Sequence, residues 1–242
     1  MRRSDVITGV AVVVASAMCG CASDDPAPPI GVDGPADAER LIRSGVGIRA
    51  SGCSLVDQLG SGIAVGDART IVTAAHTVAG ARRLAVETSE GRTITADLVA
   101  FDPDRDLAVL RTSAPIGASG DVGLELADVK LGDATVVVWD PDDGVSAAEV
   151  DVTRRLAITI EDIYVEREVR RSGLEIAGEI VVGDSGAGVV DGDGNVIGIV
   201  YAASRDRDLV GFAVDRDEVD SVLAAADAAA AEGRKIDRGR CI

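Results

Sequence analysis

The stretch GDSGAGVVDGDGNVIGIV, residues 183–200, places a serine, a turn signal and two apolar runs close together. The acidic, glycine-rich turn 191–194 separates Val189-Val190 from the run 195–201, which is typical of a β-hairpin. Ser185 precedes this hairpin, among three glycines and an acid. Glycines are tolerated where the backbone takes a positive φ or passes very close to another group. Ser185 is therefore either a hydrogen-bonding turn residue or a nucleophile with amide donors around it.

The composition limits the partners that the chain can have. Its 242 residues suffice for one sizeable domain or two small ones. Hydrophobic residues make up 47% but aromatic residues only 2%, so valine, isoleucine, leucine and alanine must build the core. The formal net charge of −17 argues against a nucleic-acid partner, since no basic patch forms without a local surplus. It also disfavours contact with an anionic membrane surface or with strongly acidic substrates.

The N-terminus is typical of an exported protein. Arg2-Arg3 precede an apolar run, residues 6–18, that is too short to span a bilayer, so residues 1–20 are predicted to be a signal peptide. Residues 18–23 resemble the cleavage box of bacterial lipoproteins, with Cys21 as the lipidated residue. Plain secretion is the alternative. We expect the protein on the outer face of the bacterial cytoplasmic membrane, held in the cell envelope only by its lipid anchor, or secreted.

A flexible tether is predicted for residues 21–43, which combine proline, glycine and acids with few large apolar side chains. The globular domain then spans residues 44–242. If Cys21 is lipidated, two cysteines remain in the mature chain, Cys53 and Cys241. Export implies an oxidising setting, so we expect these two to form a disulfide, with two unrelated thiols as the alternative.

Short β-like runs, separated by glycine and aspartate turns, fill the chain from Cys53 to Val214. Many short strands at such spacing favour a barrel or sandwich over a doubly wound α/β fold. The candidate strands besides the two already named are 61–65, 70–73, 84–88, 92–100, 107–110 and 135–138.

One helix is predicted near the C-terminus, at about residues 215–232. Asp215 is its expected N-cap, Glu218 stands where a capping-box acid belongs, and Gly233 is the expected end. An apolar stripe at helical spacing predicts the face that packs on the domain: Val219, Val222, Leu223, Ala226 and Ala230.

Three residue types that work together in acyl transfer occur in the chain. His76 is the single histidine and follows the apolar run 70–73, so it would emerge at a strand end. A serine hydroxyl such as that of Ser185 needs a base to take its proton, and a buried carboxylate fixes the tautomer of that base. Asp106 is the candidate carboxylate because it directly abuts the strand Leu107–Leu110. Asp102 and Asp104 compete with Asp106 for this role.

Three motifs in order, TAAH (73–76), DPDRDLAVL (102–110) and the opening stretch, resemble those of trypsin-like (chymotrypsin-fold) serine proteases. The resemblance is closer to the compact bacterial envelope branch that includes HtrA-type enzymes. It covers roughly residues 50–220. It implies an all-β fold of two perpendicular six-stranded β-barrels, with the catalytic triad in the cleft between them and a C-terminal α-helix after the second.

The resemblance also implies a role for each motif residue. His76 would be the general base and acid, Asp106 its orienter and Ser185 the nucleophile. The backbone amides of Gly183 and Ser185 would form the oxyanion hole. Glu179 lies where trypsin-like relatives place the base of the primary specificity pocket, and an exposed glutamate on a strand is the alternative. No metal or other cofactor is expected.

Two departures from the family pattern stand out. Ala187 and Gly188 replace the glycine and proline that usually follow the nucleophile. No PDZ-sized segment is expected after the protease region.

The sequence therefore predicts an exported, lipid-anchored serine endopeptidase that cleaves proteins or peptides through an acyl-enzyme. A catalytically inactive pseudoprotease that binds proteins in the cell envelope is the first alternative. A purely structural lipoprotein is the second, and it would make His76 and Ser185 coincidental.

Overall fold

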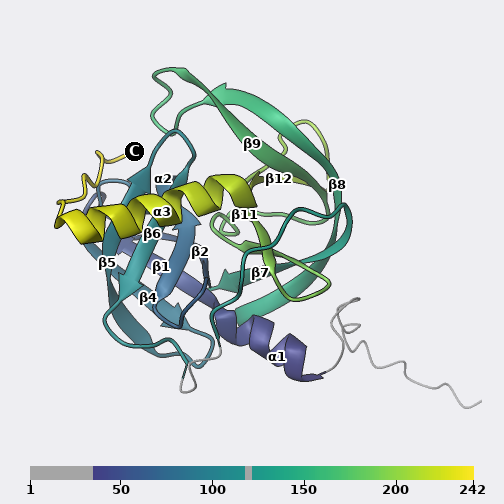
Figure 1. Cartoon of the computed structure of the whole chain (residues 1–242), viewed down its shortest axis with the longest axis horizontal. Coiled ribbons are helices and arrows are strands. Elements are labelled where there is room, and N and C mark those ends of the chain that lie inside the picture. The colour runs from purple at the N-terminus through teal and green to yellow at the C-terminus, as the bar shows by residue number, and fades with distance from the viewer. Residues whose placement is uncertain (1–34, 118–121) are drawn as a thin grey trace, which may run out of the picture.

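The computed structural model describes residues 35–117 and 122–242, which form two closed antiparallel barrels (Figure 1). The first barrel contains β1 (Gly45–Ser51), β2 (Gln58–Ala64), β3 (Thr70–Ala74), β4 (Arg83–Thr88), β5 (Thr93–Asp102) and β6 (Leu107–Thr112). The second contains β7 (Gly132–Asp140), β8 (Gly144–Glu161), β9 (Glu168–Ala177), β10 (Gly188–Asp191), β11 (Val196–Ala203) and β12 (Val210–Asp215). The prediction of two six-stranded barrels is confirmed. The predicted signal peptide and Cys21 lie outside the described residues.

The core is built from aliphatic side chains, as the composition predicts. One cluster fills the first barrel and includes Ile48, Ile71 and Leu110, and a second fills the other barrel. A third cluster joins the two barrels and the helix at the C-terminus, with Ile63 and Ile199 among its members. The barrels therefore share a continuous apolar interface, which fixes the positions of residues carried by different barrels.

The tether prediction is wrong for residues 35–43, because helix α1 (Pro35–Ser44) occupies them. Its composition is polar, but Leu41 is only 2% exposed and packs in the cluster between the barrels. The buried Ser44 hydroxyl lies 2.8 Å from Arg40 O and within hydrogen-bond distance of Val122 O, so the two carbonyls share its single proton. One apolar side chain and one buried hydroxyl fix the helix on the domain, and neither contact can be read from local composition.

Helix α3 (Arg216–Glu232) confirms the predicted C-terminal helix and packs across β5, β6 and β11 (Figure 1). The Asp215 carboxylate caps it by accepting from Asp217 N, and Gly233 ends it with a φ of 61°. Ala229 is buried where the periodicity favoured Ala230.

Glu218 is not a capping-box acid. Its carboxylate accepts from Ser172 N on β9 at 2.9 Å and from Arg105 Nε at 2.6 Å. The helix N-terminus is thereby connected to both barrels.

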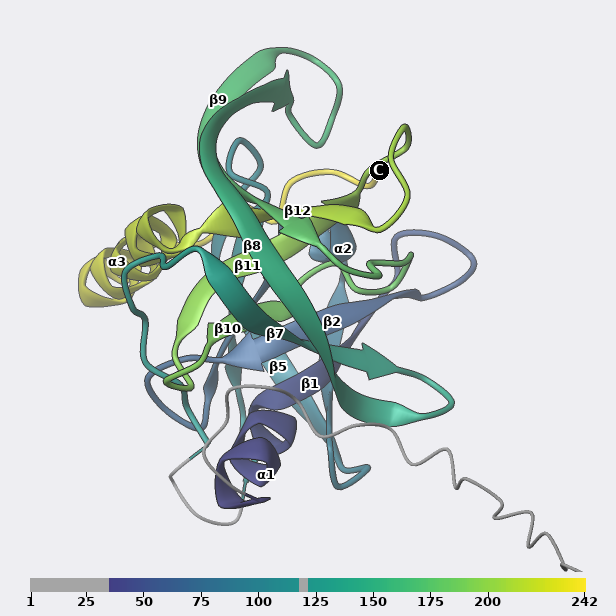
Figure 2. The ribbon, with the colours of Figure 1, turned by 90° about the vertical axis from the view of Figure 1, so that its right-hand side faces the viewer.

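Strands β8 and β9 form a long hairpin that extends beyond the second barrel (Figure 2). Its tip reaches the first barrel, where Ile163 packs in the apolar cluster and Arg167 forms an ion pair with Asp104. Arg240, in the C-terminal segment, pairs with Glu166 and lies over the Tyr164 ring. The hairpin tip therefore contacts both the loop before β6 and the end of the chain.

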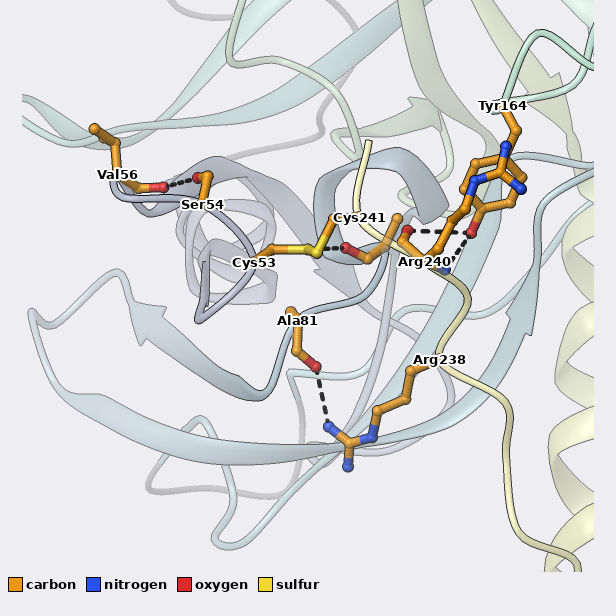
Figure 3. The surroundings of a disulfide bond; sticks show 9 residues. Cys53, Ser54, Val56, Ala81, Tyr164, Arg238, Arg240 and Cys241 are labelled. Atoms are coloured by element: carbon orange, nitrogen blue, oxygen red, sulfur yellow. Dashed lines mark hydrogen bonds between the residues drawn. A yellow bond between two sulfur atoms is a disulfide. The ribbon is translucent and has the colours of Figure 1, made fainter.

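Cys53 and Cys241 form a disulfide, as the sequence predicts, across a sequence separation of 188 (Figure 3). The C-terminal segment runs along the first barrel to reach it, and Gly80 N donates to Arg238 O at 2.8 Å. A Cβ atom at Gly80 would lie 2.5 Å from Cys241 N, so this close approach requires glycine.

Candidate active site

His76 and Asp106 form a tightly bonded pair on the first barrel. His76 lies on the short helix α2 (Ala75–Val78), which directly follows β3. Its Nδ1 lies 2.8 Å from Asp106 Oδ2, and its backbone N donates to Asp106 Oδ1 at 2.9 Å. The Asp106 side chain is 6% exposed and that of His76 is 33% exposed. The carboxylate is thus buried, while part of the imidazole remains accessible.

The backbone around Asp106 holds the carboxylate toward His76. Asp106 has a φ of 56°, in the left-handed region that aspartate tolerates better than most residues. Its carbonyl accepts from Ala75 N at 3.1 Å, next to His76. Side chain and main chain of one residue therefore both contact the segment that carries the histidine.

The two competing acids have other partners. Asp102 accepts from Arg105 N at 2.9 Å and forms an ion pair with the Arg105 side chain. Asp104 forms an ion pair with Arg167 at the tip of the β8–β9 hairpin. Of the three candidates, Asp106 alone is hydrogen-bonded to His76.

Ser185 lies in the loop before β10 and is attached to the first barrel through its backbone. Ser61 N on β2 donates to Ser185 O at 2.9 Å. The next residue, Gly186, has a φ of 93°, and a Cβ atom there would lie 2.1 Å from Ser61 O and 2.3 Å from Thr73 Oγ1. Only glycine allows this approach, which answers why the serine stands among glycines.

Gly60 is the point where the histidine segment and the serine loop meet. A Cβ atom at Gly60 would lie 2.8 Å from Thr77 Cγ2 and 3.0 Å from Ser185 O. Thr77 directly follows His76, so both predicted catalytic segments pack against the same glycine. Within residues 35–117 and 122–242, no hydrogen bond joins the Ser185 hydroxyl to the imidazole.

The predicted oxyanion-hole donors, the amides of Gly183 and Ser185, lie on either side of Asp184 in the serine loop. In the described parts of the chain, neither N–H donates a hydrogen bond to protein. Gly183 has a φ of 113°, a conformation that glycine adopts without strain. The Gly183 carbonyl accepts from the Ser61 hydroxyl at 3.3 Å, and Ala187 N donates to Asp184 O. The turn is therefore held by neighbouring groups while its two amides stay available.

Glu179 is exposed and forms no ion pair in the described structure. Asp184 beside the serine is 7% exposed and accepts from Val181 N at 2.7 Å. Burial raises the pKa of Asp184, and the charges of Glu179 and Asp140 raise it further. Glu179 thus contributes negative charge near the serine loop, and in the described structure it forms no hydrogen bond to His76 or Ser185.

Sequence analysis missed a buried arginine near the His76–Asp106 pair. Arg171 on β9 is 3% exposed, donates from Nη1 to Arg105 O at 2.9 Å, and lies 4.7 Å from the Tyr201 ring centroid. Its Nε has no hydrogen-bond partner in the described chain. The alternation of residues along the strand could have predicted its burial, because Arg171 lies on the same inward face of β9 as Val169 and Gly173.

Opposing effects set the acidity of His76. Burial lowers the pKa of the imidazole. The hydrogen bond that the ring donates to the Asp106 carboxylate, and the negative charge of that carboxylate, raise the pKa, and the positive charge of Arg171 lowers it again. The pKa of His76 ends above its ordinary value. The positive charge on a protonated His76 is therefore stabilised, as a base that receives a proton requires.

Comparison with known proteins gives one family. The model of the trypsin-like peptidase domain matches residues 60–199. Serine protease Rv3671c of Mycobacterium tuberculosis is 29% identical over 167 residues, 68% of this chain and 41% of the relative. Protease Do-like 1 of Arabidopsis thaliana is 29% identical over 168 residues, 68% of this chain and 38% of the relative. The chain thus spans about two fifths of the length of these relatives.

Solved structures agree with the sequence comparison. The crystal structure of the Rv3671c protease from M. tuberculosis in its active form matches with a TM-score of 0.73 and 25% identity, over 93% of this chain and all of that one. None of the described helices has the length and apolarity needed to cross a membrane. The matched residues include the serine loop and the His76–Asp106 pair, and the chain belongs to the trypsin-like peptidase domain family.

Proposed function

We propose that this chain is a serine endopeptidase in which Ser185, His76 and Asp106 act as nucleophile, base and orienter. The observation that carries the proposal is the buried Asp106 carboxylate, 2.8 Å from His76 Nδ1. The substrates are polypeptides, as expected for a trypsin-like fold.

His76 acts as the base through its free ring nitrogen. With Nδ1–H donated to Asp106, the lone pair stands on Nε2 and can accept the Ser185 proton. Attack of Oγ on the scissile carbonyl forms a tetrahedral intermediate, whose collapse expels the amine as His76 returns the proton to it. Water then hydrolyses the acyl-enzyme by the same sequence of proton transfers.

The free amides of Gly183 and Ser185 stabilise the negative charge of that intermediate. Each preorganised donor of this kind is worth roughly 3–4 kcal/mol in the transition state. Their availability in the described structure supports this role.

An inactive protein-binding module on the same fold is the second candidate. The missing hydrogen bond between Ser185 and His76 in the described structure favours it. Catalytic hydrogen bonds are often long or misaligned without substrate, so we give priority to the protease.

A fluorophosphonate probe separates the two candidates. We expect covalent labelling of the wild-type protein, no labelling of Ser185→Ala, and slow labelling of His76→Ala. Labelling at Ser54, an exposed serine, would be absent in all three proteins. No labelling of folded wild-type protein, together with no cleavage of denatured casein, would contradict the protease.

Export and lipidation at Cys21 belong to the same proposal. The Cys53–Cys241 disulfide supports export, because structural disulfides persist in oxidising compartments. Mass spectrometry of the membrane-bound protein from the native host should find a diacylglyceryl-modified N-terminal Cys21. Release into the medium of an unmodified chain would favour plain secretion.

A further inference from the structure

A second charged site lies on the outer surface of the first barrel. A groove of about 350 Å³ runs between β1, β4, β5 and the C-terminal segment. Four of its residues are arginines, namely Arg49, Arg82, Arg83 and Arg238. We call it the arginine groove. Asp97 is the one acid that lines it.

This concentration of positive charge is unusual in a chain with 41 acidic and 24 basic residues. Elsewhere, arginines such as Arg155 and Arg207 pair with carboxylates. In the described structure, Arg82, Arg83 and Arg238 form no ion pair, and Arg49 is 3.7 Å from Asp57. Unpaired arginines that converge on one groove repel each other, and an anion between them would relieve this repulsion.

Strand register and backbone geometry build the groove. Arg83 on β4 lies opposite Ser51 on β1, and its Nε donates to the Ser51 hydroxyl at 3.4 Å. Arg49 is two residues before Ser51, so both arginines lie on the outward face of the barrel. The stem of Arg82 passes Gly52, where a Cβ atom would lie 3.0 Å from it.

The C-terminal segment supplies the fourth arginine. Arg238 donates from Nη1 to Ala81 O at 3.3 Å, beside the disulfide (Figure 3). The bond from Gly80 N to Arg238 O holds the segment at this residue, and the Cys53–Cys241 disulfide holds it three residues further on. The Arg238 guanidinium is thereby fixed at the groove.

The groove is close in sequence to the catalytic histidine. Arg82 lies six positions after His76, and only the end of α2 and the turn at Gly80 separate them. Six residues span at most about 20 Å of extended chain, so an extended polypeptide held beside His76 could reach the groove.

We infer that the arginine groove binds the carboxylates of an acidic segment of a polypeptide substrate. The inference deepens the proposed function and rests on it. Guanidinium forks match carboxylates in bidentate geometry. The net charge of −17 repels anions at long range, but salt screens that repulsion beyond about 8 Å. The arginines of the groove therefore determine whether an anion binds there. A short acidic segment can contact the groove alone, whereas an anionic membrane would also face the rest of a chain with a net charge of −17.

Binding without cleavage tests this directly. Fluorescent hexaglutamate and hexaglutamine peptides are titrated with the Ser185→Ala protein, and anisotropy is read at low and physiological salt. We expect only hexaglutamate to bind, more weakly at higher salt. A hydrogen bond to a charged group contributes about a factor of ten to affinity. The double variant that combines Arg82→Gln and Arg83→Gln should therefore weaken hexaglutamate binding at least ~10-fold. Arg69→Gln is the matched control, an exposed arginine outside the groove and unpaired in the described structure, and should change binding less than ~2-fold.

Equal binding of the two peptides, or equal loss in the groove variant and the Arg69 control, would overturn the inference. Groove-dependent binding of phosphatidylglycerol vesicles without binding of hexaglutamate would assign the groove to a membrane and overturn it as well. Fluorophosphonate labelling distinguishes the two proposals. With Ser185 present, the groove variant should label at the wild-type rate. Failure of wild-type labelling with intact hexaglutamate binding would remove the protease and leave an anion-binding groove.

Discussion

The two halves of the candidate active site are held in different ways. The His76–Asp106 half uses charged and main-chain hydrogen bonds around a buried carboxylate. The Ser185 half depends on close backbone approaches at Gly60 and Gly186, with the amides of Gly183 and Ser185 left unpaired in the described structure. Val182 beside it is fully exposed. The proposed base is therefore positioned by hydrogen bonds that are already made within the protein, whereas the loop of the proposed nucleophile offers amides that a substrate would engage.

Asp106→Asn, which changes the His76–Asp106 half of the site, should lower kcat/KM more than any other variant that tests this comparison. The amide can no longer hold the correct tautomer of His76, so kcat/KM should fall about 10⁴-fold. Asp104→Asn is the control, because Asp104 forms an exposed ion pair with Arg167 and should stay within about threefold of wild type. Steady-state cleavage of a fluorogenic peptide measures both. Equal losses would mean that the acid of the pair has been misassigned.

Replacing both Cys53 and Cys241 with serine tests how much their disulfide, which joins the C-terminal segment to the first barrel, contributes to stability. A closed loop of this length contributes up to about 5 kcal/mol to the free energy of unfolding in the chain-entropy model. Urea unfolding should find a loss of that order, matched by reduction of the wild-type protein. Hydrogen exchange should accelerate in β1 and residues 79–82 before it does in β10. A loss below about 1 kcal/mol would show that main-chain contacts alone hold the C-terminal segment.

Gly186→Ala acts on the serine half of the site, where Gly186 packs against β2 and β3. The new Cβ atom would overlap Ser61 O, so the loop must shift, and a shift of about 1 Å should cost roughly 10²-fold in kcat/KM. Gly91→Ala is the matched control, with a φ of 74° but open space around the added atom. It carries similar backbone strain and should leave catalysis unchanged. If both variants lose activity alike, general destabilisation and not the loop is the cause.

The smallest expected effect is a shift in the pH dependence of kcat/KM. Because Asp106 raises the pKa of His76, kcat/KM should fall as the pH drops through that raised pKa and the imidazole becomes protonated. Arg171→Met removes a positive charge that lowers this pKa, so the acid limb should move to higher pH. Arg170→Met, an exposed neighbour on β9, should leave the limb in place. Movement of the limb to lower pH would contradict the assigned influence of Arg171.

Sequence patterns predicted the features that depend on local signals. The glycines around Ser185 and the position of Asp106 at the start of a strand reflect constraints within a few residues. The disulfide followed from counting cysteines under the expectation that the protein is exported to an oxidising compartment. These predictions needed no knowledge of which strands pair.

The features that were missed depend on contacts between distant segments. Glu218 has the spacing of a capping-box acid, but Arg105 and Ser172 offer its carboxylate stronger partners from other elements. Helix α1 is polar, and its position is set by Leu41 entering a cluster formed by both barrels. The arginine groove collects residues from three strands and the C-terminal segment, so the net charge of the chain gave no indication of it.

The position of Glu218 has a consequence for truncation from the C-terminal end. Its carboxylate connects the first turn of α3 to Arg105, which directly precedes Asp106 in the chain. A chain cut before α3 would lose this acceptor together with the apolar cover on β5 and β6, and Arg105 would be released from one of its two acidic partners. Trimming by another protease at this end would thus loosen the loop that carries Asp106, the proposed triad acid, although Asp106 itself is hydrogen-bonded to Ala75 and His76.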